Sequence, residues 1–296
     1  MEAIPRLLAA IRAVVRGKDP VVELALVAVL AEGHVLIEDV PGVGKTTLAA
    51  SVAGALGLGF SRVQFTADLL PADLTGVNVL RDGAFSFRPG PIFAHVVLAD
   101  ELNRTTPRTQ SALLEAMEEG KVSVDGETHQ LPRPFVVLAT RNPWEHYGTY
   151  PLPESQLDRF LMQLSLGYPD RESEREILRR SGRGLVNRAV TAEELERMLA
   201  AVSEVRVHRE VEDLILTLVE RSRRDARFLR GVSPRGARAL YRAVRALALV
   251  RGRDFAVPED VRELAVPVLA HRVAGRGAQE GEALIRALLD ELPAPG

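Results

Sequence analysis

The sequence contains no cysteine among its 296 residues, so disulfide bonds and metal sites built on thiolates are excluded. Lysine is scarce as well, because it occurs only at positions 18, 45 and 121 while arginine supplies the other basic residues. The net charge is −2, which gives no indication of the broad positive surface that nucleic acids attract. Apolar residues make up 46%, enough for a core in one large domain or two smaller ones.

Long hydrophobic runs are also absent. The longest apolar stretch, residues 21–30, is interrupted by Glu23 and is too short to span a bilayer. Residues 4–15 place apolar side chains at helical spacing with arginines between them, which predicts an amphipathic helix and not a signal peptide. We therefore expect a cytoplasmic protein without membrane insertion.

A glycine-bearing loop follows the first predicted strand. The apolar residues 34–38 lead into Asp-Val-Pro-Gly-Val-Gly-Lys-Thr at 39–46, and a helix is predicted to follow. This order presents backbone N–H groups and the positive end of a helix dipole to phosphate groups. Lys45 can reach the β- and γ-phosphate oxygens, and the hydroxyl of Thr46 can bind Mg²⁺. The candidate nucleotide-binding residues are Pro41, Gly42, Val43, Gly44, Lys45, Thr46 and Thr47.

The loop departs from the usual phosphate-binding pattern at one position. That pattern begins with glycine five residues before Gly44, where this chain has Asp39. The alternative interpretation is an ordinary turn that carries a solvated lysine. The strand before the loop and the helix after it favour the phosphate site.

Two acidic residues end another predicted strand. Residues 94–99 form a nearly continuous apolar run, as expected of a strand buried on both faces, and Asp100 and Glu101 follow it. Buried carboxylates are costly unless they have a partner, and ligands of open α/β sheets bind at the carboxyl ends of the strands. We expect Asp100 to hold Mg²⁺ and Glu101 to polarise an attacking water. The alternative is that both acids merely begin an exposed loop.

Strands and helices alternate in the N-terminal half, which indicates an α/β fold with a mostly parallel sheet. Five strands are predicted, at 34–38, 61–65, 94–99, 135–139 and 161–165. Helices are predicted at 4–15, 20–32, 45–56 and 107–119. From about residue 170 the pattern is helical and charged, with helix-start signals at Thr191, Ser233 and Pro258 and a last helix at 279–292. We expect an α/β domain at 1–168 and an all-α domain at 169–296.

Two β-hairpins interrupt this alternation. Residues 77–80 and 84–87 flank one turn, and 121–124 and 128–131 flank another; both turns contain Asp-Gly, a strong hairpin signal. A single hairpin is most simply interpreted as decoration of the sheet. Two, each beside a strand of the predicted site, indicate devices that contact another molecule.

Three more polar residues are candidates for the site. Asn142 follows the strand at 135–139, where its amide could orient water or contact a γ-phosphate, or simply form a turn before proline. Arg159 could pair with Asp158 or reach the phosphate of a neighbouring subunit. Arg235 lies in the first turn of a predicted helix, an unfavourable place for a cation unless a phosphate or a nearby carboxylate compensates it.

These motifs, in this order, resemble those of the AAA+ ATPases and, within them, the MoxR family. The segments that carry the resemblance cover nearly the whole chain, at 33–46, 64–73, 87–93, 98–104, 109–117, 148–154, 156–161 and 231–235. One departure is Arg141, where family members often have glutamine. The resemblance implies Walker A residues Lys45 and Thr46, Walker B residues Asp100 and Glu101, sensor 1 at Asn142, an arginine finger at Arg159 and sensor 2 at Arg235.

The resemblance also implies how such a protein works. Its fold would be a five-stranded P-loop sheet with two hairpin inserts that face the pore of a ring, followed by a helical lid domain. Its cofactors would be ATP and Mg²⁺, and its assembly a hexamer. It would act as a chaperone-like ATPase that remodels or matures client protein complexes, often with a partner that carries a von Willebrand factor A domain.

Two other functions fit parts of the sequence. A DNA motor or loader of the same superfamily would share the nucleotide site, but the balanced charge and the lack of a basic module after the lid disfavour it. An interaction module that uses nucleotide only as a switch would not need Glu101. The sequence therefore predicts an ATP-hydrolysing enzyme that acts on protein clients.

Overall fold

The computed structural model describes residues 2–81, 83–142, 144, 148–179, 186–276 and 280–292. A five-stranded sheet lies at its centre, in the order β2-β5-β8-β1-β9, with every neighbouring pair parallel. The strands are β1 (Val35–Glu38), β2 (Phe60–Gln64), β5 (Val96–Asp100), β8 (Val136–Arg141) and β9 (Met162–Leu164). The predicted five strands and parallel sheet are confirmed.

The two faces of the sheet build two separate cores. Alternate residues of a strand point to opposite faces, so Val96 and Leu98 pack on one side while Val97 and Ala99 pack on the other. The first side is covered by α1 (Ala3–Arg12), α2 (Asp19–Leu30) and α3 (Lys45–Leu56), and the second by α5 (Pro107–Glu119). Because both faces are covered, the central strands can be almost wholly apolar.

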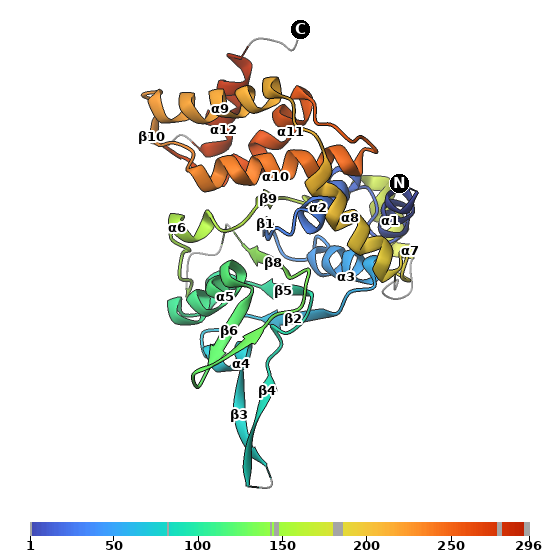
Figure 1. The fold of residues 1–296 in the computed structure, drawn as a ribbon, viewed down its shortest axis with the longest axis vertical. Helices are drawn as coiled ribbons and strands as arrows, with labels where there is room; N and C mark the ends of the chain where they lie inside the picture. The colour runs from blue at the N-terminus through green and yellow to red at the C-terminus, as the bar shows by residue number, and fades with distance from the viewer. Residues whose placement is uncertain are drawn as a thin grey trace.

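The chain after β9 is mostly helical, and its last four helices form a layer beside the sheet (Figure 1). Its helices are α7 (Arg171–Arg179), α8 (Ala192–Glu204), α9 (Arg209–Arg224), α10 (Pro234–Val250), α11 (Pro258–Leu269) and α12 (Gly281–Asp290). Thr191 forms the predicted capping box with Glu194, and the Ser233 hydroxyl caps α10. The expected all-helical region also holds a short antiparallel pair, β10 (Phe228–Arg230) with β11 (Ala274–Gly275). Residue 279, the expected start of the last helix, lies outside the described residues.

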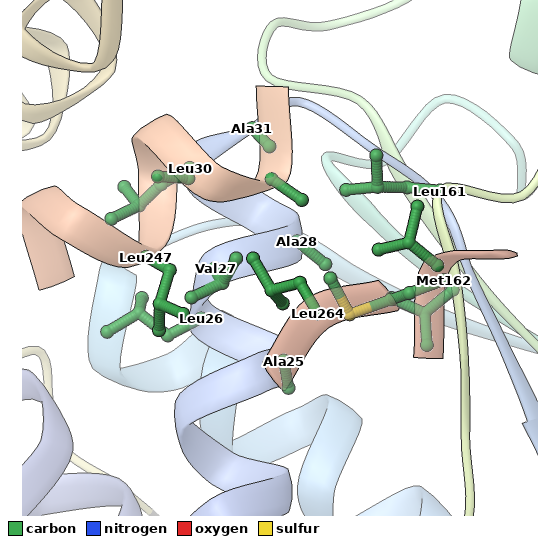
Figure 2. Packing of buried hydrophobic residues seen from close by; sticks show 14 of the residues in the cluster. Ala25, Leu26, Val27, Ala28, Leu30, Ala31, Leu161, Met162, Leu247 and Leu264 are labelled. Carbon is green, nitrogen blue, oxygen red and sulfur yellow. The ribbon is translucent and has the colours of Figure 1, made fainter. Parts of the chain in front are cut away.

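Helix α2 joins the sheet to the C-terminal helices. Its side chains are buried almost all round. Figure 2 shows Leu26 and Val27 packed between Leu247 and Leu264 of the C-terminal helices, and Leu161 and Met162, at the start of β9, lie on the other side. Burial of an aliphatic side chain stabilises a fold by about 1.5–3 kcal/mol. One continuous apolar core therefore runs from the five-stranded sheet into the C-terminal helices.

Both predicted hairpins are present. The first is β3 (Gly76–Arg81) with β4 (Ala84–Pro89), which extends away from the body of the molecule (Figure 1). The second is β6 (Lys121–Val124) with β7 (Glu127–Gln130). The second hairpin packs against the base of the first, because the rings of Phe87 and His129 stack at 3.7 Å and Asn78 donates a hydrogen bond to Asp125, in the turn of the second hairpin, at 2.9 Å. The two inserts thus form one structural unit.

Short elements complete the chain. These are α4 (Pro71–Thr75), α6 (Glu154–Leu157) and the 3₁₀ turns η1 (Leu102–Arg104) and η2 (Ala270–Arg272). Among the described residues, no helix is both long enough and apolar enough to cross a membrane.

Candidate functional site

A pocket of about 580 Å³ opens at the carboxyl ends of β1, β5 and β8. It brings together the loop after β1, the acidic pair after β5 and the amide after β8, as predicted. Its lining residues from the predicted set are Pro41, Gly42, Gly44, Lys45, Thr46, Thr47, Asp100, Glu101 and Asn142. Val43 is the exception, because its side chain packs against the hydrophobic core instead. The site therefore lies where open α/β sheets bind ligands.

The loop after β1 has the backbone path of a phosphate cradle. Gly42 and Gly44 have φ angles of 86° and 101°, in the region that favours glycine. Gly44 is the N-cap of α3, so the N–H groups of the first helical turn and the positive end of the helix dipole lie at the pocket. The Lys45 ammonium donates a hydrogen bond to the Asp39 carbonyl oxygen at 2.8 Å, which holds the side chain beside the loop.

Asp39, the departure from the usual pattern, is a buried anchor. One carboxylate oxygen accepts hydrogen bonds from the backbone N–H groups of Leu166 and Gly167, both at 2.6 Å, and from the Ser165 hydroxyl at 3.1 Å. The other oxygen accepts from the N–H of Val40 at 2.9 Å. Hydrogen bonds to a charged group are about twice as strong as neutral ones. Asp39 thus joins the loop to the segment that follows β9.

Thr140 organises the acidic pair. Its hydroxyl donates to an Asp100 carboxylate oxygen at 2.7 Å and accepts from the backbone N–H of Glu101 at 2.9 Å. Glu101 has a φ of 58°, a strained conformation for a residue with a side chain. Such strain persists only where the surroundings enforce it, and it clusters at functional sites.

Two side chains from β2 also contact the acidic pair. The Arg62 guanidinium donates to the second Asp100 oxygen at 2.7 Å, and the Gln64 amide donates to Glu101 at 2.6 Å. Arg104 forms an ion pair with Glu101 at 3.2 Å. None of these three residues was given a role at the site from the sequence, although Gln64 and Arg104 lie in segments that carry the family resemblance. The pairing of β2 with β5 brings Arg62 and Gln64 to the acidic pair, and this pairing is a property of the fold.

Asn142 forms the expected turn and also lines the pocket. Arg141, just before it, forms an ion pair with Glu38 across the β1–β8 pair at 2.6 Å. The Asn142 amide oxygen accepts a hydrogen bond from the N–H of Trp144 at 3.2 Å while the residue lines the pocket. The cation at Arg141 is therefore neutralised within the sheet and does not project into the pocket beside Asn142.

Arg159 and Arg235 lie in a different pocket, of about 540 Å³. Both guanidinium groups bind Glu118 at the end of α5, Arg159 at 3.2 Å and Arg235 in close contact with the other oxygen. Arg159 also donates to the Leu114 carbonyl oxygen at 2.7 Å. Arg159 therefore pairs with Glu118, and not with Asp158, which was the alternative. Glu118 likewise compensates the unfavourable position of Arg235 in the first turn of α10.

The two pockets lie at opposite ends of the parallel strands. The first is lined by residues that follow β1, β5 and β8, whereas the second is lined by Gly33 and His34 before β1 and Leu161 before β9. Four residues of β1 separate them, about 13 Å at the rise of a strand. An arginine side chain cannot span that distance and still reach a phosphate. Neither Arg159 nor Arg235 lines the first pocket in this structure.

His34 forms the wall between the second pocket and the core. Its Nδ1 accepts from the Val137 N–H at 3.0 Å, so its Nε2 carries the proton and donates to the Met117 carbonyl oxygen at 2.9 Å. Burial lowers the pKa of His34 to about 4, the bond to Met117 opposes this, and the charge of Arg242 lowers it further. The ring is neutral at pH 7 and fixes the end of α5 that carries Glu118.

Comparisons with known proteins agree with this geometry. Residues 34–162 match the family described as "ATPase family associated with various cellular activities (AAA)", and residues 220–292 match the AAA lid domain. YeaC of Bacillus subtilis is 45% identical over 301 residues, which cover 96% of this chain and 92% of that protein. The chaperone MoxR1 of Mycobacterium tuberculosis is 41% identical over 286 residues, 92% of this chain and 76% of that protein. A crystal structure from Cytophaga hutchinsonii shares 35% identity with a TM-score of 0.92, covering 99% of this chain and 94% of that chain.

Proposed function

This chain belongs to the MoxR family of AAA+ ATPases, and on that premise we propose that it couples ATP hydrolysis to the remodelling of protein clients. The observation that carries the proposal is the separation of the candidate residues into two pockets, at the carboxyl ends and at the amino ends of the strands of one sheet. A site divided in this way is complete only between two copies of the chain. Nucleotide turnover would then be linked to movement of neighbouring subunits.

In this proposal the first pocket holds the triphosphate. Lys45 would leave the Asp39 carbonyl for the β- and γ-phosphate oxygens, and the N–H groups at the start of α3 would bind the remaining oxygens. The Thr46 hydroxyl and the Asp100 carboxylate supply the oxygen ligands that Mg²⁺ prefers, in the same pocket. Bound Mg²⁺ would neutralise charge that develops on the phosphates during transfer.

Glu101 and Asn142 would act on the attacking water. Glu101 reaches the pocket from a strained backbone position and is held by Gln64, so its carboxylate is oriented before substrate arrives. As general base it would accept the proton of the water, and the Asn142 amide would orient that water or contact the γ-phosphate. Thr140 fixes the relative positions of Asp100 and Glu101.

Arg159 and Arg235 would complete the site of a neighbouring subunit. Their shared partner Glu118 gives them one common direction of approach, and phosphate oxygens of the neighbour would replace its carboxylate. Such an arginine is worth about 10³–10⁵ in turnover. Heterologous contacts of this kind form a ring when the rotation between subunits closes, and we propose a hexameric ring on the family resemblance.

The hairpin unit is the proposed contact with clients. Near the tip of the first hairpin, the Leu80 and Phe85 side chains are 65% and 75% exposed, an unusual place for large apolar groups. The net charge of −2 and the similarity to a chaperone support a protein client over DNA. A partner with a von Willebrand factor A domain, and a division of the chain near residue 168 into nucleotide and lid domains, are parts of the same proposal.

Protein concentration provides the test of a divided site. ATP turnover per subunit should rise with concentration as copies assemble, and flat turnover across a hundredfold dilution would show that each chain works alone. Duplex DNA should leave turnover unchanged, whereas stimulation by DNA would favour the motor alternative. A client should be retained by Glu101→Gln in ATP and not by Lys45→Ala, which cannot bind nucleotide in this account.

A further inference from the structure

The segment that carries Arg159 is held by a buried arginine from the C-terminal helices. Arg272, in η2, donates to the carbonyl oxygens of Leu161 at 2.9 Å and Asp158 at 3.2 Å, and in close contact to that of Phe160. Only 2% of its side chain is exposed. Three carbonyl groups around Arg159 therefore take their positions from a residue more than 100 positions later in the chain.

Asp158 connects the same segment to the start of α10. One carboxylate oxygen accepts from Arg272 Nε at 2.8 Å, and the other accepts from the Ser233 hydroxyl at 3.0 Å. Ser233 is the N-cap of α10, two residues before Arg235. The two arginines of the second pocket are thus joined through one carboxylate, in addition to their common contact with Glu118.

This network contains a buried ion pair, which the packing of the core does not require. A buried charge is costly, and a buried ion pair is often no more stabilising than well-packed apolar residues. Burial lowers the pKa of Arg272 to about 10, and the charge of Asp158 opposes that shift, so the guanidinium stays charged at neutral pH. A fixed fork of donors that bonds several carbonyl oxygens does, however, specify geometry.

We propose that Asp158 and Arg272 are positioning residues that hold Arg159 and Arg235 as one rigid unit for the neighbouring subunit's nucleotide. The inference rests on the proposed divided site. Because Arg272 belongs to the C-terminal helices and Arg159 to the sheet domain, the network makes the lid and the finger move together. The structural alternative is that the ion pair only stabilises the fold of its own chain.

Asp158→Asn tests the proposal, because it keeps the shape of the side chain and removes the charge that orients Arg272. Nucleotide affinity should stay within about twofold, since the first pocket is untouched, while turnover should fall on the order of 10²-fold, the cost of a small misplacement of a catalytic group. Arg272→Lys keeps the charge but loses the fork, and it should give the same pattern if Asp158→Asn does not fold.

Mixed assemblies distinguish positioning from a general loss of structure. With Lys45→Ala, which retains an intact Arg159, the Asp158→Asn chain should regain activity because its own nucleotide pocket is sound. With Arg159→Ala, which has no finger, it should remain inactive. Rescue by Arg159→Ala, failure of rescue by Lys45→Ala, or full activity of Asp158→Asn alone would each overturn the proposal.

Asp260→Asn is a matched control. Asp260 is fully buried and pairs with Arg253 at 2.6 Å in the same helical part of the chain, without contacts to the segment at 158–161. It should lower thermal stability and leave turnover of the folded protein unchanged. If Lys45→Ala and Arg159→Ala do not rescue each other, the divided site itself fails. If they do, and Asp158→Asn does not behave as a finger defect, only the positioning role fails.

Discussion

The carboxylate of Asp39 accepts a hydrogen bond from the backbone N–H of Gly167 at 2.6 Å. This bond ties the first residue of the phosphate-type loop to the point where the chain leaves the sheet after β9. The usual glycine could not make it. The departure from the common motif therefore provides a direct link between the nucleotide loop and the segment that leads to the C-terminal helices.

Asp39→Gly, although it restores the usual motif, should weaken the protein. The buried N–H of Leu166 would lose its acceptor, which costs about 1–3 kcal/mol, and the loop would gain backbone freedom. We expect a lower free energy of unfolding in urea and weaker ATP binding in a titration. Asp39→Asn keeps one oxygen and should lie between parent and glycine variant. An Asp39→Gly chain as stable as the parent would remove the anchoring role.

Thr140→Val should impair turnover more than binding. The change keeps the shape of the side chain but removes the hydroxyl that connects Asp100 with the N–H of Glu101. Because Lys45 and the loop are unaffected, the affinity for ATP should change little while kcat falls on the order of 10-fold or more. Thr140→Ser retains the hydroxyl and should keep most of the activity. Equal effects of valine and serine would contradict this role.

The stability of the fold should fall as the pH drops below the ordinary pKa of histidine, because of the buried ring of His34. The folded pKa of His34, about 4, lies below the ordinary value of 6.5, so the neutral ring stabilises the fold fully above pH 6.5. As the pH drops from 6.5 to 4, His34 becomes protonated in the unfolded chain and stays neutral in the folded chain, so the free energy of unfolding falls by about 3 kcal/mol. Urea unfolding across this range measures the loss.

The control for this titration is His34→Gln, which cannot titrate. Carboxylates and His271 also change protonation in acid, so the difference between parent and variant isolates His34. The stability advantage of the parent over the variant should shrink as the pH falls towards 4. Parallel stability curves would show that the buried ring does not govern this dependence.

Arg235→Ala should reduce turnover through the neighbouring subunit. Since Arg235 lies in the second pocket with Arg159, its loss should leave ATP binding intact and should be rescued by mixing with Lys45→Ala. Arg245→Ala, on the same helix but outside that pocket, should keep the parent turnover. An Arg235→Ala chain that binds ATP weakly would instead place Arg235 at its own nucleotide.

Local patterns predicted much of this fold. Residues that start and stop a helix or strand bound the strand, loop and helix at 34–56 and the helix at 107–119. The structure has these elements at nearly the predicted positions. The hairpins follow from Asp-Gly turns in the same way. The short pair β10 and β11 was not predicted, because strands of three and two residues have no periodicity of their own.

The connections between motifs could not be predicted. Nothing near Glu118 in the sequence indicates that it binds two arginines, and nothing near Asp39 indicates that its carboxylate binds the segment after β9. Each of these contacts joins residues far apart in the chain. Sequence patterns selected the candidate residues, whereas the parallel direction of the strands places residues that follow them in one pocket and residues that precede them in another.

The central claim is that a complete site needs two copies of this chain. Lys45→Ala removes the nucleotide pocket and keeps the arginines, whereas Arg159→Ala does the reverse. Each variant alone should hydrolyse ATP at least 10³-fold more slowly than the parent. The decisive measurement is ATP turnover of an equimolar mixture: the account predicts a substantial recovery of activity, and a mixture no more active than its separate components would contradict it.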